Sequence, residues 1–468
     1  MFLDRSKIRP VLILGVLLVL LAGGVVLAEG LLQTVLFTIL ASSGVVLSAA
    51  LWPEVLVMAY LFAGRYEYDA RLAPFDLPLS VNQMMLVGLV GLALVNASHL
   101  GRVLRSWTMV TLLLFGLVMV LGLGWSYGLI YGLYKVTHTW LVVIPGVVIA
   151  ATVVLRRRSL TPLIAATFLV GFALNGAALL TFEQSMGGNR LTGLGSGPIV
   201  FARTVGLSLL IGLLTLVWLV QRGAPRWRDR GAILLCVAAV GLLIPGFVLA
   251  QSRGPALGLA AALATVLVLS LYGNWRVMIA GVVFGSGVLW AANLVISTML
   301  EHTRFDLTKE SNQAGLDGRV NHLTDTWAVI VDNPLIGAGT GGWPVSVYGI
   351  DHRMYPHNFF AEIASENGVP MALLIGVLFA VILGRGFVAW LKAREPKSRF
   401  ILLGSLATFA FYAVNISATG DTPDNRLVWL ILASVELSAR FAREQVTSQV
   451  VVARVPARNG PWSTSPAR

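Results

Sequence analysis

The stretch "AILLCVAAVGLLIPGFVLA" (residues 232–250) decides the fold class of this chain. It contains no charged side chain, and a helix of this length crosses about 30 Å of hydrocarbon at 1.5 Å per residue. The segment before it, "QRGAPRWRDR" (221–230), is basic, and the segment after it, "QSRGPALGLA" (251–260), opens another apolar run. This pattern is typical of a membrane-spanning helix whose basic flank lies in the cytoplasm.

The composition of the whole chain agrees with this stretch. Of the 468 residues, 57% are hydrophobic and 12% are charged, and the mean hydropathy is +0.81, whereas soluble domains are about a quarter charged. The composition excludes a soluble globular protein and predicts an all-α polytopic membrane protein. Cys236 is the single cysteine, which excludes a disulfide framework and a cysteine-based metal site.

Apolar runs long enough to span a bilayer recur along the chain. A shorter run at 51–64, broken by Pro53, counts as a span if all the basic loops are to face one side. The prediction is then fourteen transmembrane helices, with twelve as the alternative. These spans are expected to be nearly free of charged residues, apart from Glu436. The longer runs cover residues 10–28, 31–49, 81–97, 106–122, 139–155, 160–181, 200–220, 232–250, 255–271, 277–298, 371–391, 400–418 and 427–441.

Positive residues predict the orientation of the chain. Basic loops such as "RRR" (156–158) and "KAREPKSR" (392–399) mark the cytoplasmic side, so both termini are expected there. The same topology accounts for the formal net charge of +12, and a nucleic-acid partner is not expected. Residues 1–468 are predicted to form a single transmembrane domain, with one large outer loop at 299–370 and a disordered cytoplasmic tail at 441–468.

The large outer loop holds most of the polar chemistry. Its segment "RVNHLTDTWAVIVDNP" (319–334) predicts an amphipathic helix on the membrane face or on top of the bundle, with Val320, Leu323, Trp327 and Ile330 on one side. The glycines of "GAGTGGW" (337–343) predict a structural turn. Four histidines lie in the loop, but none of their spacings matches a helical zinc motif, so no metal is predicted.

The loop ends in "YPHNFFAEIASENG" (355–368), which reads as a helix. Pro356 is expected at the first helical position, and Gly368 is expected to end the helix. The fourfold spacing of Asn358, Glu362 and Glu366 predicts a shared polar side, while the intervening phenylalanines and Ile363 face an apolar neighbour.

Arginines near the outer ends of spans are a second group of candidates. Arg190, Arg203 and Arg253 lie where a cation costs a few kcal/mol unless it is paired or faces a cavity. Glu183 is the one acid near them in the sequence, so both an internal salt bridge and a bound anion remain open. Arginine binds phosphate or diphosphate with forked donors.

Three blocks of sequence together resemble the O-antigen ligase and polymerase superfamily of bacterial envelope glycosyltransferases. They are "SRGPALGL" (252–259), "DGRVNHLTDTWAVIVDNPLIGAGTGGW" (317–343) and "PHNFFAEIASENG" (356–368), followed by three predicted spans. The resemblance implies a membrane-embedded, GT-C-like glycosyltransferase of the bacterial inner (plasma) membrane. It also implies a glycan donor on undecaprenyl diphosphate and an acceptor hydroxyl on a glycan or a lipid A-core, used on the periplasmic face without cofactor or metal.

The resemblance suggests roles for the candidate residues. His357 would accept the proton of the attacking hydroxyl, with Glu362 as a competing base. Arg190, Arg203 and Arg253 would hold the diphosphate leaving group. Two further candidates are Asn358, which would orient the acceptor or the histidine, and Arg319, which would anchor the loop or bind phosphate. Direct displacement by the acceptor would invert the anomeric centre.

Two alternatives to a ligase remain open on the sequence. Met371 stands where the ligase signature has Gly, Thr or Tyr, and the N-terminus is longer than is common for ligases, so a polymerase is favoured. A transporter of lipid-linked glycans is the alternative from another class, for which ionisable residues within several spans and an internal repeat are expected. The sequence does not identify the acceptor, the sugar, its linkage or the oligomeric state.

Overall fold

The computed structural model describes residues 30–62, 81–187, 190–193, 196–221, 227–271, 310–418 and 421–454. Among these residues every regular element is helical except one short antiparallel hairpin, β1–β2. The spans predicted at 10–28 and 277–298 lie outside the described residues. The helix α20 (Leu427–Arg454) continues into the region predicted to be a disordered tail, so its first part is helical.

The described elements run from α2 to α20 in chain order. The first part of the chain contains α2 (Gly30–Leu51), α3 (Pro53–Leu61), α4 (Val81–Val95), α5 (Ala97–Leu104), α6 (Trp107–Gly122), α7 (Leu129–His138), α8 (Ile144–Arg157) and α9 (Thr161–Leu180). Then come α10 (Phe182–Ser185), β1 (Met186–Gly187), β2 (Arg190–Leu191), α11 (Pro198–Gln221), α12 (Trp227–Leu249) and α13 (Arg253–Ser270). The last part contains α15 (Glu310–Asp332), α16 (Trp343–Tyr348), α17 (Phe359–Asn367), α18 (Val369–Lys392), α19 (Pro396–Ala418) and α20.

Eight helices within the described residues are long and apolar enough to cross a membrane. A ninth candidate consists of α4 and α5, which are bent by 93° at Asn96. The structure therefore confirms an all-α polytopic membrane protein, while the count of fourteen spans stays a prediction. At nine residues, α3 is only about 14 Å long and does not cross a bilayer by itself.

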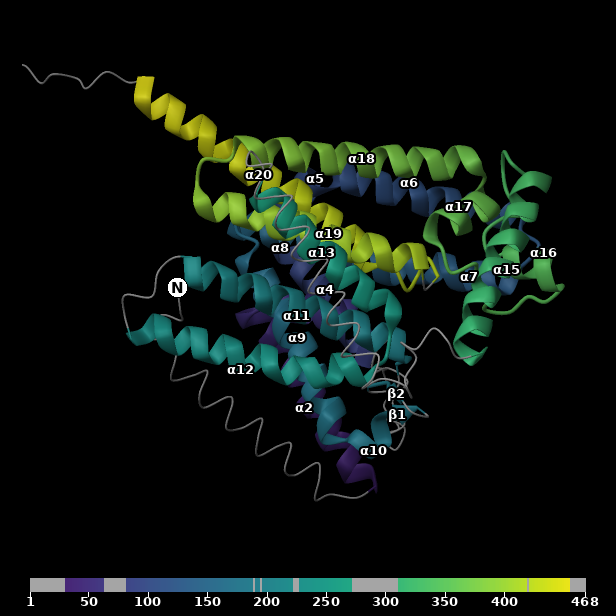
Figure 1. Cartoon of the computed structure of the whole chain (residues 1–468), viewed down its shortest axis with the longest axis horizontal. Coiled ribbons are helices and arrows are strands. Elements are labelled where there is room, and N and C mark those ends of the chain that lie inside the picture. The colour runs from purple at the N-terminus through teal and green to yellow at the C-terminus, as the bar shows by residue number, and fades with distance from the viewer. Residues whose placement is uncertain are drawn as a thin grey trace, which may run out of the picture.

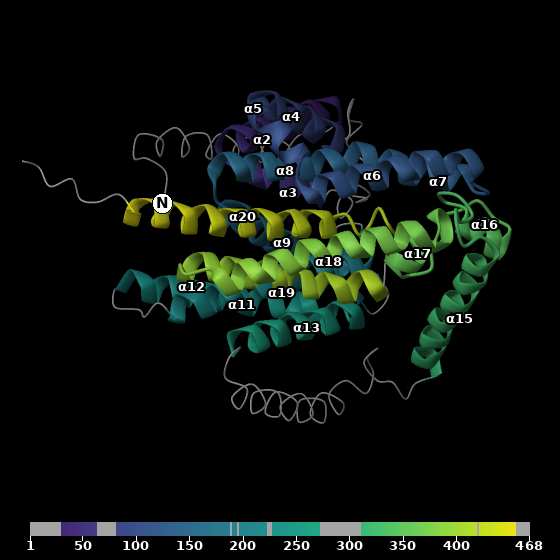
Figure 2. The same ribbon diagram turned by 90° about the horizontal axis from the view of Figure 1, so that it is seen from above.

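The long helices run in the same general direction and form one bundle (Figure 1). At the right of Figure 1 the bundle carries α15, α16, α17 and the hairpin, and we call this the loop end. At the other end, called the basic end after its arginines, α20 projects beyond its neighbours. Figure 2 shows α15 crossing the loop end rather than following the bundle. The span formed by α7 and α8 is 72% buried, as is α11, so these helices form the centre.

The span of α7 and α8 is longer than the sequence predicted. It runs over Leu129–Arg157, with π-helical turns at Thr139–Val143 between its two helices. Pro145 has no N–H to donate, so the carbonyl of Leu141 lacks its usual helical partner, and the Tyr60 hydroxyl donates to it instead. The expectation that the spans are nearly free of charge was wrong, because this extended span contains Lys135.

The start of α7 explains why the prediction missed ten helical residues. Both carboxylate oxygens of Asp351 accept hydrogen bonds from the first turn, from Ile130 N at 2.8 Å and from Tyr131 N at 3.0 Å. An acidic side chain satisfies the free N–H groups of a helix start and complements its dipole. Since Asp351 is more than two hundred residues away in sequence, this cap is not visible in the local pattern.

The outer loop contains the predicted helix and the predicted turn. On α15, the side chains of Val320, Leu323 and Trp327 are exposed, whereas Ile330 is buried against the bundle. In the turn that follows, Gly337, Gly339 and Gly341 have φ of +68°, +82° and +79°, a region that glycine enters without strain. The turn packs closely on α7, because a Cβ on Gly132 would stand 2.2 Å from the carbonyl oxygen of Thr340.

Candidate functional site

The helix that carries the polar motif starts three residues later than predicted, at Phe359 instead of Pro356. Asn358 is the N-cap of α17, and its side chain accepts a hydrogen bond from Ala361 N at 3.0 Å. Pro356 therefore lies before the helix, and His357 has φ +59°, in the left-handed region. The expectation for Pro356 was wrong because the asparagine side chain provides the stronger start signal. Gly368 ends α17 as predicted.

His357 lies in a half-buried aromatic setting. Its ring centroid is 4.7 Å from that of Tyr355 and 5.6 Å from that of His322 on α15. Within the part of the chain that the structure describes, its buried Nδ1 has no hydrogen-bond partner. Burial, together with the neighbouring His322 and Arg319, lowers the pKa of His357 to about 4. At neutral pH the imidazole is uncharged and able to accept a proton.

A small aromatic group fixes α15 beside this histidine. The Nδ1 atom of His322 lies 2.9 Å from the hydroxyl of Tyr348 on α16. The fully buried Trp343 donates from Nε1 to Thr326 Oγ1 at 2.9 Å. Because both bonds join α15 to α16, they hold the helix that carries Arg319 at the loop end. Sequence reasoning gave His322 no role, since its partners lie on another element.

Arg203 lies within the bundle at the same end. It extends from α11 and is 1% exposed. Its guanidinium donates from Nη1 to Asn425 Oδ1 and from Nη2 to the carbonyl of Asn415, both at 3.0 Å. Its charge contributes to the lowered pKa of His357. Arg203 and Arg319 therefore both lie within electrostatic reach of His357, as the functional hypothesis requires.

Arg190 and Arg253 lie together at the turn between α12 and α13. Arg190 on β2 donates from Nε to the carbonyl of Ala250 and from Nη2 to that of Gln251, at 3.0 and 3.2 Å. These bonds shape the turn that precedes Arg253, the first residue of α13. Arg190 therefore bonds to the backbone of the turn and helps to hold the start of α13.

The outer end of α19 lies close both to Arg203 and to α13, the helix that carries Arg253. Asn358 donates from Nδ2 to the carbonyl of Ser417 at 3.2 Å, and the carbonyl of Asn415 accepts from Arg203. On α13, Gly258 lies so close to α19 that a Cβ there would stand 2.5 Å from Asn415 Nδ2. The start of α13, which carries Arg253, therefore lies in the same region of the loop end.

A buried ionic cluster that the sequence analysis missed lies beneath this site. Lys135 Nζ is 2.6 Å from Glu362 Oε1 and 2.6 Å from Glu366 Oε1, and the three side chains are at most 3% exposed. Thr422 adds donors to Glu362 Oε1 from its hydroxyl and its N–H. We call these three charged residues the Lys135 cluster. A lysine between aromatic residues just ahead of an apolar run was the signal that could have found it.

One ammonium group faces two carboxylates in the Lys135 cluster. Burial raises the pKa of Glu362 to about 7; Lys135 opposes this rise, while Glu366 and Asp421 add to it. The cluster therefore takes up a proton near neutral pH, which relieves the repulsion between the carboxylates. The side chain of Glu362 is 1% exposed, so it stabilises the base of the site and does not reach an acceptor in this conformation.

A second ion-paired group binds the outer loop to the loop between α19 and α20. Arg353 donates from Nε to Asp421 Oδ2 at 3.1 Å and from Nη2 to Asp424 Oδ2 at 2.9 Å. The hydroxyl of Tyr131 also donates to Asp421 Oδ2, at 2.8 Å. Burial alone would raise the pKa of Asp421, but Arg353 and Lys135 outweigh it and hold this pKa below its usual value.

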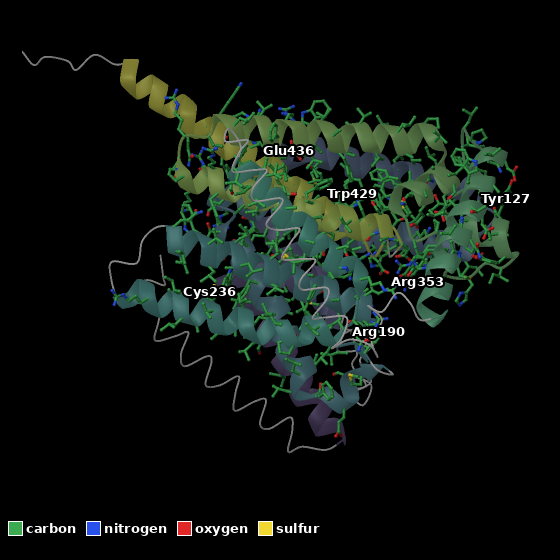
Figure 3. All side chains as sticks on the ribbon, in the orientation of Figure 1. Tyr127, Arg190, Cys236, Arg353, Trp429 and Glu436 are labelled. Atoms are coloured by element: carbon green, nitrogen blue, oxygen red, sulfur yellow. The ribbon has the colours of Figure 1, made fainter. Side chains whose placement is uncertain are left out.

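The labelled side chains in Figure 3 show how the polar groups are distributed along the bundle. Arg353, Arg190 and Tyr127 lie at the loop end, whereas Glu436 and Cys236 lie toward the basic end. Within the described residues no group of three or more His, Cys, Asp or Glu side chains could hold a metal ion.

Residues 238–376 match the O-antigen ligase family. The matched region runs from α12 to the start of α18 and contains Arg253, Arg319, His357 and Glu362, but not Arg190 or Arg203. The match agrees with the family resemblance drawn from the sequence and supports, in general terms, a role in glycan transfer at a membrane. None of the curated protein sequences matches this chain.

Proposed function

We propose that this chain is a glycosyltransferase that moves a glycan from undecaprenyl diphosphate to an acceptor hydroxyl at the loop end. The observation that carries the proposal is the state of His357: a half-buried imidazole, uncharged at neutral pH, whose buried Nδ1 has no partner among the described residues. A base held in this state accepts the proton of an attacking sugar hydroxyl as the C1–O bond to the diphosphate breaks.

The arginines supply the positive charge that the leaving group needs. Arg319 and Arg203 lie close enough to His357 to lower its pKa, and Arg253 is the first residue of α13, which packs against α19. Charge grows on the diphosphate as it leaves, and guanidinium groups held in place before the reaction stabilise it without a metal ion. Direct displacement by the acceptor inverts the anomeric centre.

Three of the predicted site residues take supporting roles in this proposal. Arg190 holds the turn before Arg253 through its bonds to two backbone carbonyls. Glu362 keeps α17 in place through Lys135. Asn358 caps α17 and is bonded to α19, so it fixes the backbone next to the proposed base.

The test is single-turnover transfer by the purified full-length protein in liposomes that contain a labelled undecaprenyl-diphosphate oligosaccharide. We expect His357→Ala to lower the rate on the order of 100-fold or more, the usual contribution of a general base. The matched control is His352→Ala, which removes an exposed histidine of the same loop. Near-normal product from His357→Ala would overturn its role, and translocation of the label without a new glycosidic bond would favour the transporter.

The acceptor is tested in cells by silver-stained gels of surface polysaccharide after deletion and restoration of the gene. A core that bears a single repeat unit indicates a polymerase, which the departure at Met371 favours. A bare core with long lipid-linked chains indicates a ligase.

A further inference from the structure

A basic cavity lies away from the proposed active site, at the basic end of the bundle. It has a volume of about 750 Å³ and lies between α5, α8, α18 and α20. Five arginines line it: Arg102, Arg105, Arg385, Arg440 and Arg443. The proposed glycosyl transfer makes no use of them.

The two acids that also line this cavity are already engaged. Both oxygens of Glu436 accept hydrogen bonds from the start of α6, at 2.9 Å from Trp107 N and 2.9 Å from Thr108 N. Glu444 forms an ion pair with Arg440 at 2.9 Å on the same helix. Five guanidinium groups against two carboxylates leave the cavity with a formal excess of positive charge.

The inner wall of the cavity is apolar. It is formed by side chains such as Leu155 on α8, Ile382 on α18 and Leu437 on α20, all of them buried in the bundle. A ligand that matches both parts has an anionic group for the arginines and hydrocarbon for this wall. A free nucleotide or metabolite would leave the apolar wall without a matching contact.

The position of α5 gives the depth of the cavity relative to the membrane. This helix turns 93° away from α4 at Asn96, and Arg156 donates to Asn96 Oδ1 at 3.0 Å, which stabilises the turn. A helix bent across the direction of the spans lies in the plane of the bilayer surface. Arg102 on α5 and Arg105 directly after it therefore lie at the level of the lipid headgroups.

We propose that this cavity binds the headgroup of an anionic phospholipid, whose phosphodiester lies against the arginines and whose acyl chains lie along the apolar wall. The positive-inside rule accounts for arginines at this end of the bundle. It does not account for their convergence on one cavity from α5, α18 and α20. Basic pockets between transmembrane helices bind anionic headgroups in this way.

The test uses native mass spectrometry of the purified full-length protein with an equimolar mixture of phosphatidylglycerol and phosphatidylcholine of equal chain length. We expect bound phosphatidylglycerol to exceed phosphatidylcholine by roughly tenfold or more, since each arginine near a surface favours an anionic lipid by ~1 kcal/mol. The double variant Arg105→Gln/Arg385→Gln should lose most of this preference. Equal binding of the two lipids by the wild type would overturn the proposal.

A control pair removes the same charge outside the cavity. Arg230→Gln/Arg394→Gln changes two arginines that do not line it, and it should keep the preference; an equal loss in both pairs would indicate nonspecific attraction and overturn the site. Should Arg105→Gln/Arg385→Gln not fold, the exposed pair Arg102→Gln/Arg443→Gln takes its place, with the same expected loss. Displacement of the lipid by excess inorganic phosphate alone would assign the cavity to free phosphate and overturn the lipid proposal.

Discussion

His357 illustrates how the surroundings of one residue set its chemistry. Histidine in water is half-charged near pH 6.5, but at this position burial and neighbouring positive charge lower its pKa to about 4. Glu362, the competing base, has a pKa raised to about 7 by burial. The two candidates therefore lose their base form at different pH values, which makes them distinguishable by kinetics.

We predict that kcat/KM for glycan transfer falls only below a pH of about 4, because a base of lowered pKa stays unprotonated until then. The measurement is the rate of transfer in liposomes across the acidic range. Arg319→Gln removes a positive neighbour of His357, so it should move this acid limb to higher pH, whatever it does to the maximal rate. A limb near pH 7 would identify Glu362 as the base and contradict the assignment to His357.

Lys135 shows the reverse case, a charge that is tolerated only because of its partners. We predict that Lys135→Met lowers the free energy of unfolding by roughly 3–5 kcal/mol, since it leaves two buried carboxylates without a counterion. Thermal unfolding of the purified protein measures the effect. Adding Glu366→Gln should recover part of the loss, and Lys392→Met, at the exposed end of α18, should have little effect. A Lys135→Met variant as stable as the wild type would contradict this account.

At the scale of elements, the glycine turn (residues 337–343) packs closely on α7 because backbone atoms alone meet at the contact with Gly132. We predict that Gly132→Ala destabilises the protein by about 1–3 kcal/mol, the usual range for overpacking, because its Cβ would stand 2.2 Å from Thr340 O. The control is Gly124→Ala in the neighbouring 3-10 turn, where no atom lies within 4 Å of the added Cβ. Equal melting temperatures for the two variants would show that the contact can relax.

The helices of the outer loop show which elements a local pattern predicts. The stretch 319–334 was predicted to contain a helix, and its residues 319–332 lie within α15, because its apolar residues recur at helical spacing. The start of α7 was missed because its cap, Asp351, belongs to a distant segment. The start of α17 was misplaced by three residues, since Pro356 and Asn358 are both start signals and only the folded chain selects one.

At the scale of the whole molecule, the proposed site and the basic cavity lie at opposite ends of one bundle (Figure 3). The positive-inside rule predicts that the loop end faces the periplasm and the basic end the cytoplasm. Such an arrangement places glycan transfer on one side of the membrane and the proposed phospholipid site on the other.

Cysteine labelling tests this orientation directly, because Cys236 is the single native cysteine. In a Cys236→Ala background, we predict that His352→Cys reacts with a membrane-impermeant maleimide in intact spheroplasts. Arg394→Cys, at the other end of the bundle, should react only after the membrane is opened. The reverse pattern would contradict the predicted orientation of the termini and of the site.

The sequence by itself determined that this is an all-α polytopic membrane protein, and its short motifs carried the resemblance to the O-antigen ligase family that the match over residues 238–376 supports. Hydropathy, charge bias and short motifs are local properties, and they survive in the unfolded chain. Only the tertiary structure decided that Lys135 meets Glu362 and Glu366, and that Arg353 meets Asp421. A buried charge is stable only beside its counterion, and these partners come from helices that folding brings together from distant parts of the chain.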